Sequence, residues 1–195
     1  MSVTLWLVRH GQTAWNVEGR FQGQADPPLN AEGRAEARRL AVQLRGRTMD
    51  ALYSSDLRRA RQTADILSRA VGKPVLLEPR LREINQGQWE GMLFTDISRQ
   101  LPEISQVRQR NALDFRPPGG ETVREMAARV LPAIDEIGHL YPGGQVLIVS
   151  HGVVLAAILA VVNHIPWMDV FSLIPPNAGL LAVKWAGTPP GVLDV

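Results

Sequence analysis

The chain of 195 residues contains no cysteine and only two lysines, Lys73 and Lys184. Without cysteine there is no disulfide framework, no thiolate nucleophile and no metal site built on thiolate ligands. The positive side chains are almost all arginines, they are scattered along the chain, and the formal net charge is only +2. A chain of this kind lacks the clustered basic patch of a nucleic-acid surface, so no nucleic-acid partner is expected.

Long uninterrupted apolar runs are also missing. The nearest candidate is residues 146–162, VLIVSHGVVLAAILAVV, which Ser150, His151 and Gly152 interrupt. A membrane-spanning helix needs roughly twenty predominantly apolar residues, so this segment is interpreted as a buried strand followed by a buried helix. The N-terminus has neither the charged region nor the long apolar region of a signal peptide, and a cytoplasmic protein without membrane contact is expected.

The remaining sequence alternates between short apolar strands and periodic helices. Strands are expected at residues 5–8, 50–55, 74–79 and 146–150, and helices at residues 30–46, 56–72 and 121–140. Strands that are apolar throughout indicate a mostly parallel sheet that is covered on both faces. The pattern predicts an α/β fold, a three-layer α/β/α sandwich formed by one domain over residues 1–195.

Two further segments are harder to place. Weakly periodic helices are expected around residues 96–110. Near the C-terminus, AGLLAVKW and GVLDV (residues 178–185 and 191–195) predict a closing strand or hairpin at the sheet edge.

Polar side chains follow the ends of several predicted strands. Arg9 and His10 come directly after the first strand, Arg58 begins the helix after the second strand, and His151 follows a later strand. In open α/β sheets, ligands bind beyond the carboxyl ends of the strands. The sequence therefore predicts that these separated side chains meet in one site.

Several motifs carry a resemblance to a known family. They are LVRHGQTAWN, RFQGQADPPLNAEGRAEA, YSSDLRRARQTA, LREINQGQWEG, PPGGET and VSHG, in this order. Together they resemble the histidine phosphatase superfamily, the phosphoglycerate mutase-like proteins, and cover nearly the whole chain. The resemblance implies a phosphohistidine mechanism with no metal and no other cofactor.

The implied catalytic residues are His10, Glu83, Arg9, Arg58 and His151. Phosphoryl transfer needs an in-line nucleophile and positive groups around the phosphate oxygens. His10 is expected to be the nucleophile, with the two arginines and His151 as phosphate donors. The resemblance places the proton donor and acceptor at Glu83, and Glu90 is the nearest rival.

Other residues are expected to contact the substrate or to shape the pocket. The substrate-binding candidates are Thr13, Asn16, Gln22, Gly23 and Gly152. Trp89 is expected to pack in the interior, with a pocket wall as the alternative. A metal site is not expected, because no acidic cluster or paired histidines with ligand spacing occur, and Arg9 beside His10 would repel a cation.

Within the resembled family, the sequence favours a phosphatase over a mutase. The segment from residue 91 to 118 is short and contains no lysine, and Val153 follows the second His-Gly pair. The phosphatase branch that it resembles includes α-ribazole phosphatase and broad-specificity phosphatases. The expected partner is a small-molecule phosphate ester, either α-ribazole phosphate, a sugar phosphate or another monoester, and a homodimer is one option for assembly.

Two alternatives stay open at this point: a cofactor-dependent phosphoglycerate mutase, and a phospho-ligand binding protein without turnover. The resemblance also implies a small, mainly helical cap excursion at about residues 91–120. Its side chains Met92, Leu93, Phe94, Leu113 and Phe115 either receive an apolar or ring-bearing leaving group or pack into the interior of the cap.

Overall fold

The central sheet has five strands in the order β3-β2-β4-β1-β5. The computed structural model describes residues 2–193. The strands are β1 (Val3–Arg9), β2 (Ala51–Ser54), β3 (Val75–Leu77), β4 (Gln145–Ser150) and β5 (Leu180–Trp185). β1 to β4 pair in parallel, and β5 alone pairs antiparallel, with β1. The expectation of a mostly parallel sheet is confirmed.

The expected helices are found close to their predicted positions, and a short helix at Ala14–Glu18 was not predicted. The helices are α1 (Ala14–Glu18), α2 (Ala31–Leu44), α3 (Arg58–Val71), α4 (Phe94–Gln100), α5 (Ile104–Arg110), α6 (Val123–Leu140) and α7 (Gly152–Asn163), with 3₁₀ turns η1 (Pro79–Leu81), η2 (Gly87–Trp89) and η3 (Trp167–Leu173). Asn30 caps α2 by accepting from the Gly33 N–H at 2.8 Å. Thr122 caps α6 in a capping box with Glu125. These side chains satisfy N–H groups that have no partner inside the helix.

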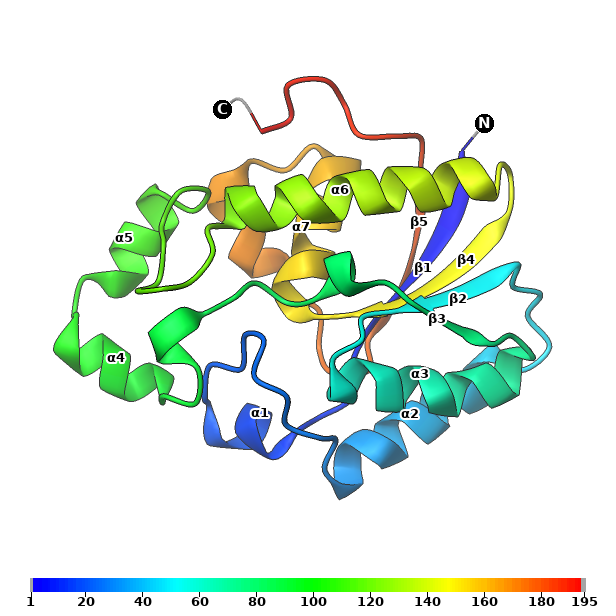
Figure 1. Cartoon of the computed structure of the whole chain (residues 1–195), viewed down its shortest axis with the longest axis horizontal. Helices are drawn as coiled ribbons and strands as arrows, with labels where there is room; N and C mark the ends of the chain where they lie inside the picture. The colour runs from blue at the N-terminus through cyan, green and yellow to red at the C-terminus, as the bar shows by residue number, and fades with distance from the viewer. Residues whose placement is uncertain (1, 194–195) are drawn as a thin grey trace.

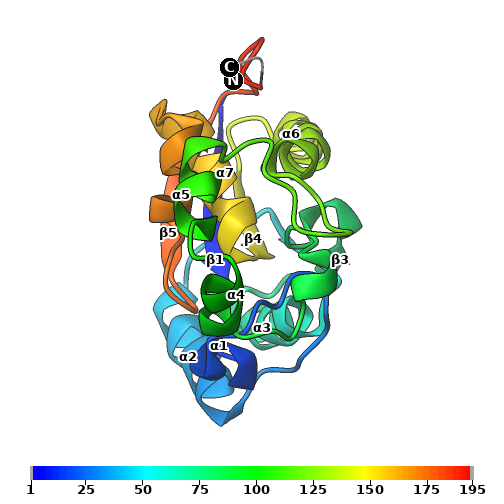
Figure 2. The same ribbon diagram turned by 90° about the vertical axis from the view of Figure 1, so that its left-hand side faces the viewer.

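The sheet separates two helical layers, as Figures 1 and 2 show. Successive β4 residues point to opposite faces, so that Val146 and Ile148 pack with α6 and α7, whereas Leu147 and Val149 pack with α2 and α3. Both faces of the strand are therefore covered. This arrangement is the predicted three-layer sandwich.

The cap excursion and the C-terminal segment complete the fold. α4 and α5 lie at one end of the molecule (Figure 1), where Trp89, Ile97 and Ile104 form a small separate core. β5 is the closing strand, and the described part of residues 191–195 is a turn, while residues 194 and 195 lie outside the described part. Within residues 2–193, no helix has the length and apolar character needed to cross a membrane.

Strand register places the two motif histidines together. β1 and β4 are parallel neighbours, with Arg9 opposite Ser150. The main-chain N–H of His10 donates to the Ser150 carbonyl at 2.9 Å. His10 and His151 therefore leave adjacent strands at the same sheet edge, and their ring centroids are 5.2 Å apart.

Candidate active site

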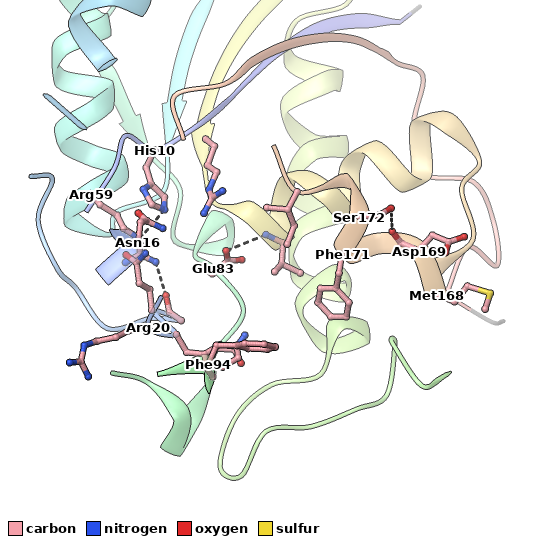
Figure 3. A pocket seen from close by; sticks show the side chains of 17 residues that line it. His10, Asn16, Arg20, Arg59, Glu83, Phe94, Met168, Asp169, Phe171 and Ser172 are labelled. Atoms are coloured by element: carbon pink, nitrogen blue, oxygen red, sulfur yellow. Dashed lines mark hydrogen bonds between the residues drawn. The ribbon is translucent and has the colours of Figure 1, made fainter. Parts of the chain in front are cut away.

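A cavity of about 520 Å³ lies beyond the carboxyl ends of β1 and β4 (Figure 3). Its lining comes from the end of β1 and the residue after it, α1 and the loop that follows it, α3, the segment before η2, α4, the start of α7, and η3 with the residue after it. The lining residues are Arg9, His10, Asn16, Arg20, Phe21, Gln22, Gly23, Arg59, Glu83, Gln86, Phe94, Val153, Met168, Asp169, Phe171, Ser172 and Ile174. Side chains that are far apart in the sequence therefore meet in one cavity, and of the four predicted at the strand ends Arg9 and His10 are among them.

The turn after β1 fixes the His10 backbone. A Cβ atom on Gly11 would lie 2.4 Å from the carbonyl oxygen of Gly33, so only glycine allows the two chains to approach this closely. The Gly11 N–H donates to the Thr63 Oγ1 on α3 at 3.0 Å. The turn is thus anchored to both α2 and α3.

Two contacts determine which ring nitrogen of His10 carries the proton. Its Nδ1 lies 2.8 Å from the carbonyl oxygen of Gly11, which can only accept. Its Nε2 lies 3.2 Å from Arg59 Nε, which can only donate. Both contacts are satisfied when Nδ1 holds the proton and Nε2 presents its lone pair. Nε2 is the nucleophilic nitrogen of this tautomer.

Burial keeps His10 neutral. The side chain is buried, and this burial lowers its pKa well below 6.5, with the charges of Arg59 and Arg9 lowering it further. A neutral imidazole is the form required for nucleophilic attack.

The structure corrects the predicted second arginine. Arg59, not Arg58, lines the cavity, and its guanidinium also donates to the carbonyl oxygens of Gly23 and Ala25, each at 2.7 Å. Arg58 is one residue earlier on α3 and its side chain is exposed to solvent. One residue turns a helix by about 100°, so the two side chains lie on different faces. Burial lowers the pKa of Arg59 to about 10, which leaves it cationic at neutral pH.

Arg9 supplies a second cation at this end of the cavity. Its Nη1 donates to the carbonyl oxygen of Pro175 at 2.8 Å, while its Nε is buried and has no partner within the described part of the chain. Burial lowers its pKa, and the nearby carboxylates of Glu83 and Glu36 partly offset this effect.

His151 lies behind His10 and does not line the cavity. It is buried, its Nε2 lies 2.8 Å from Ser55 Oγ, and its Nδ1 has no partner among residues 2–193. Burial lowers its pKa well below 6.5, with further lowering by Arg59 and His10. The structure thus places a neutral imidazole against His10 rather than the charged donor that a phosphate contact would favour.

Glu83 reaches the cavity from the irregular segment between η1 and η2. Its Oε1 accepts from the Ile84 N–H at 3.0 Å, and its Oε2 accepts from the Val153 N–H at 3.2 Å (Figure 3). The rival Glu90 does not line the cavity. Its Oε1 instead accepts from the N–H groups of Gln24 and Gln86, at 2.8 and 3.2 Å. Of the two carboxylates, the structure brings only Glu83 into the site.

The predicted substrate-binding residues divide into two groups. Asn16, Gln22 and Gly23 line the cavity. Thr13 does not, because it is buried as the N-cap of α1, where its hydroxyl accepts from the Asn16 N–H at 3.1 Å. Gly152 begins α7 outside the lining, and a Cβ atom there would lie 3.6 Å from the Arg9 guanidinium carbon. Thr13 and Gly152 therefore shape the site without facing the cavity.

One wall of the cavity was not predicted. η3 and Ile174 after it provide Met168, Asp169, Phe171 and Ser172 as well as the Ile174 side chain. A 3₁₀ segment between prolines has no helical periodicity or chemical motif, so the sequence carries little signal for this wall.

The two alternatives for the cap side chains are divided between them. Of its side chains only Phe94 lines the cavity, whereas Met92 and Phe115 pack with Trp89 and Leu113 joins the main core. The prediction that Trp89 packs in the interior is confirmed.

The two buried histidines predict a pH dependence of stability. Because burial lowers the pKa of both His10 and His151 well below 6.5, the unfolded chain takes up protons in mild acid while the folded chain does not. Each histidine then lowers the unfolding free energy by up to about 1.4 kcal/mol per pH unit below pH ~6.5. Denaturant unfolding at several values between pH 7 and 5 should show this fall, and His10→Gln should remove roughly half of its slope. A flat profile over this range would contradict neutral burial of the pair.

The fold and the site define an α/β enzyme whose cavity holds an unprotonated imidazole nitrogen among guanidinium groups. The chain belongs to the histidine phosphatase superfamily (branch 1), whose profile matches residues 5–194. The predicted family is confirmed. Within residues 2–193, no group of three or more histidine, aspartate or glutamate side chains has an arrangement that could hold a metal ion.

Individual relatives carry both mutase and phosphatase names. A probable phosphoglycerate mutase GpmB of Escherichia fergusonii is 36% identical over 166 residues, 85% of this chain and 77% of the relative. A mycobacterial glucosyl-3-phosphoglycerate phosphatase, solved with VO3, is similar with a TM-score of 0.84 and 34% identity, covering 92% of this chain and 91% of that chain. A putative alpha-ribazole-5'-P phosphatase from Escherichia coli has a TM-score of 0.84 at 28% identity, covering 94% and 91%.

Proposed function

We propose that this protein is a metal-independent phosphomonoesterase that forms a phosphohistidine at His10 and acts on a small phosphorylated metabolite. The observation that carries the proposal is the tautomer of His10. A carbonyl oxygen at Nδ1 and a guanidinium N–H at Nε2 leave Nε2 unprotonated, with its lone pair accepting from Arg59 until a phosphate takes that hydrogen bond. Two further features support the proposal, namely the cations of Arg9 and Arg59 at this end and the carboxylate of Glu83 in the same cavity.

In the first step, His10 Nε2 attacks phosphorus and the bond from phosphorus to the ester oxygen breaks. Arg59 and Arg9 neutralise the equatorial oxygens, where charge accumulates in the transition state. The Arg59 N–H that rests on Nε2 transfers its hydrogen bond to a phosphate oxygen. Glu83, in its protonated form, gives its proton to the leaving oxygen, which departs as an alcohol.

In the second step, water attacks the phosphohistidine on the side that the alcohol has left. Glu83, now a carboxylate, accepts a proton from the water. The bond between Nε2 and phosphorus breaks, inorganic phosphate is released, and Glu83 and His10 return to their starting states. One carboxyl group thus serves both steps.

The outer cavity favours a phosphatase over a mutase. Arg20 is the remaining arginine of the lining, but its guanidinium binds Glu18 at 2.5 Å and the Gly91 carbonyl at 2.7 Å and points away from Glu83 in Figure 3. Apart from Arg9, Arg59 and Arg20, the charged residues of the lining are the acids Glu83 and Asp169. A phosphoglycerate carboxylate would therefore lack a cation there. The relatives named as mutases make phosphoglycerate mutase the alternative, and a non-catalytic phospho-ligand binding protein is the other.

The aromatic side chains in the lining suggest what kind of leaving group fits. Phe94 from α4 and Phe171 from η3 lie toward the end of the cavity opposite His10 (Figure 3). Phe94 is 43% exposed although it is a large apolar side chain. A ring-bearing, uncharged leaving group such as a sugar or a nucleoside would cover these rings on binding.

A substrate panel tests the proposal. After exhaustive treatment with EDTA, the enzyme should release phosphate from p-nitrophenyl phosphate and from ring-bearing monoesters, and should not convert 3-phosphoglycerate into 2-phosphoglycerate. Full activity is expected because arginines neutralise the phosphate. Loss of activity that a divalent metal restores would contradict the mechanism. Isomerisation faster than phosphate release would establish the mutase, and phosphate binding without turnover would establish the binding protein.

A further inference from the structure

One guanidinium on α6 holds the segment that carries Glu83. Arg129 Nη1 donates to the carbonyl oxygens of Arg80 at 2.6 Å and Arg82 at 2.7 Å. Its Nη2 donates to the carbonyl oxygen of Glu83 itself at 2.9 Å. Residues 82–86 lie between η1 and η2 and belong to no helix or strand. Hydrogen bonds from outside the segment therefore have to fix its path.

The remaining two N–H groups of Arg129 bind one carboxylate. Nε donates to Glu121 Oε1 at 2.8 Å and Nη2 to Glu121 Oε2 at 2.9 Å. All five N–H groups of the guanidinium thus have acceptors, which is its full capacity. Glu121 Oε2 also accepts from the Asn85 N–H at 3.1 Å. The pair therefore contacts the main chain on both sides of the Glu83 side chain.

The Arg129–Glu121 pair is mostly buried, with side-chain exposures of 22% and 16%, and neither residue lines the cavity. Within the part of the chain that the structure describes, the hydrogen-bond donors at the Glu83 carboxylate are the neutral main-chain N–H groups of Ile84 and Val153. The location of that carboxylate consequently depends on the backbone that Arg129 holds.

We propose that Arg129 and Glu121 are positioning residues, which hold the Glu83 carboxylate within reach of the leaving oxygen. The inference rests on the proposed acid–base role of Glu83. A general acid must come within hydrogen-bond distance of the oxygen that it protonates. A displacement of about 1 Å is enough to cost roughly 10²-fold in rate. The guanidinium of Arg129 extends from a long helix that packs on the sheet, and a rigid element of this kind is well suited to such positioning.

Loss of the pair should affect proton transfer and leave phosphate binding intact. His10 and Arg9 are held by β1 and the loop after it, and Arg59 by α3 and by the carbonyls of Gly23 and Ala25. The Gln24 Nε2 links this loop to the Glu83 segment, donating to the Glu83 carbonyl at 3.2 Å, and this contact does not involve Arg129. A poor leaving group such as an alkoxide needs the proton, whereas p-nitrophenolate leaves without it. Removing Arg129 should therefore separate these two classes of substrate.

The test compares kcat/KM of Arg129→Met on glycerol phosphate and on p-nitrophenyl phosphate. A loss of about 10–100-fold is expected on glycerol phosphate, and a much smaller loss on p-nitrophenyl phosphate. The ratio of the two values is the readout, because it does not depend on how much of the variant is folded. Competitive inhibition by inorganic phosphate should be unchanged, and Glu121→Gln should change the ratio in the same direction.

Arg124→Met is the matched control. Arg124 lies on the same helix and makes a similar two-point contact, with Asp114 at 2.6 and 2.9 Å, and Asp114 does not line the cavity. This variant should leave the substrate ratio at the wild-type value. Equal losses on both substrates in Arg129→Met, or the same ratio change in Arg124→Met, would overturn the positioning role.

Glu83→Gln, measured in parallel, separates this inference from the proposed function. The substitution should cost about 10²–10⁴-fold on glycerol phosphate and far less on p-nitrophenyl phosphate. If Glu83→Gln lowers kcat/KM much more on glycerol phosphate than on p-nitrophenyl phosphate and Arg129→Met does not, the positioning role fails and the acid role stands. If Glu83→Gln lowers kcat/KM equally for both substrates, the acid role itself is wrong, and the positioning inference is overturned with it.

Discussion

His10→Ala is expected to abolish turnover of every phosphate ester. The variant has no nitrogen at which a covalent intermediate can form, and the arginines alone cannot supply a nucleophile. Loss of a covalent nucleophile costs on the order of 10⁴-fold or more in kcat. Steady-state hydrolysis of p-nitrophenyl phosphate measures it well, because this substrate needs the least help from the general acid.

Exposed His139 on α6 provides the control. His139→Ala should keep wild-type kinetics, and His10→Ala should still unfold cooperatively, because His10 lies at the end of β1 rather than in the apolar core. A folded His10→Ala variant that retains more than a small fraction of the wild-type activity would show that His10 is not the nucleophile.

Arg59→Ala is expected to lower kcat/KM by about 10²–10³-fold, as for other donors aimed at charge that develops in a transition state. The substitution removes a cation from the phosphate end of the cavity. It also leaves the carbonyl oxygens of Gly23 and Ala25 without their donor. Competitive inhibition by vanadate should weaken in the same variant, since the same guanidinium would bind the oxyanion.

The neighbouring substitution Arg58→Ala separates the two arginines of the motif. The Arg58 side chain is exposed and outside the cavity, so activity and vanadate inhibition should stay close to wild type. If Arg58→Ala were the damaging substitution and Arg59→Ala were tolerated, the arrangement at the start of α3 described above would be wrong.

The sheet could be predicted because burial on both faces leaves a direct trace in the sequence. Strands such as β4 are apolar at successive positions since each neighbouring residue packs on a different helical layer. The meeting of His10 and His151 also follows from sequence, once their strands are taken as parallel and their carboxyl ends as one rim. That β1 and β4 are direct neighbours depends on long-range pairing that no local pattern encodes.

Arg58 and Arg59 are adjacent on α3, and the motif alone did not show which of the two is buried at the site. Arg59 shares a buried face of α3 with Ala60, Thr63 and Ala64, and Arg58 lies outside it. The spacing of these small residues therefore indicates which arginine is buried. Arg59 precedes Thr63 by four positions, about one helical turn, so the two side chains lie on the same face. An arginine buried by hydrogen bonds to distant carbonyls breaks the usual rule that charged side chains are exposed, and the sequence does not show those carbonyls.

The positioning contacts around Glu83 could not be predicted either. Arg129 looks like any surface arginine of an amphipathic helix, and its acceptors are main-chain carbonyls that have no signature in side-chain chemistry. The wall formed by η3 was missed for a related reason, because side chains on a 3₁₀ turn follow no apolar repeat. Both features arise from the tertiary path of irregular segments.

Trapping the intermediate tests the central claim most directly. The enzyme is mixed rapidly with a phosphate ester carrying labelled phosphorus, denatured in base during the first turnover, digested and mapped by mass spectrometry. The account predicts one base-stable, acid-labile phosphoryl group per chain, attached to His10 through Nε2 and absent from His10→Ala. Turnover with no labelled enzyme at any time, or a label on a residue other than His10, would contradict it.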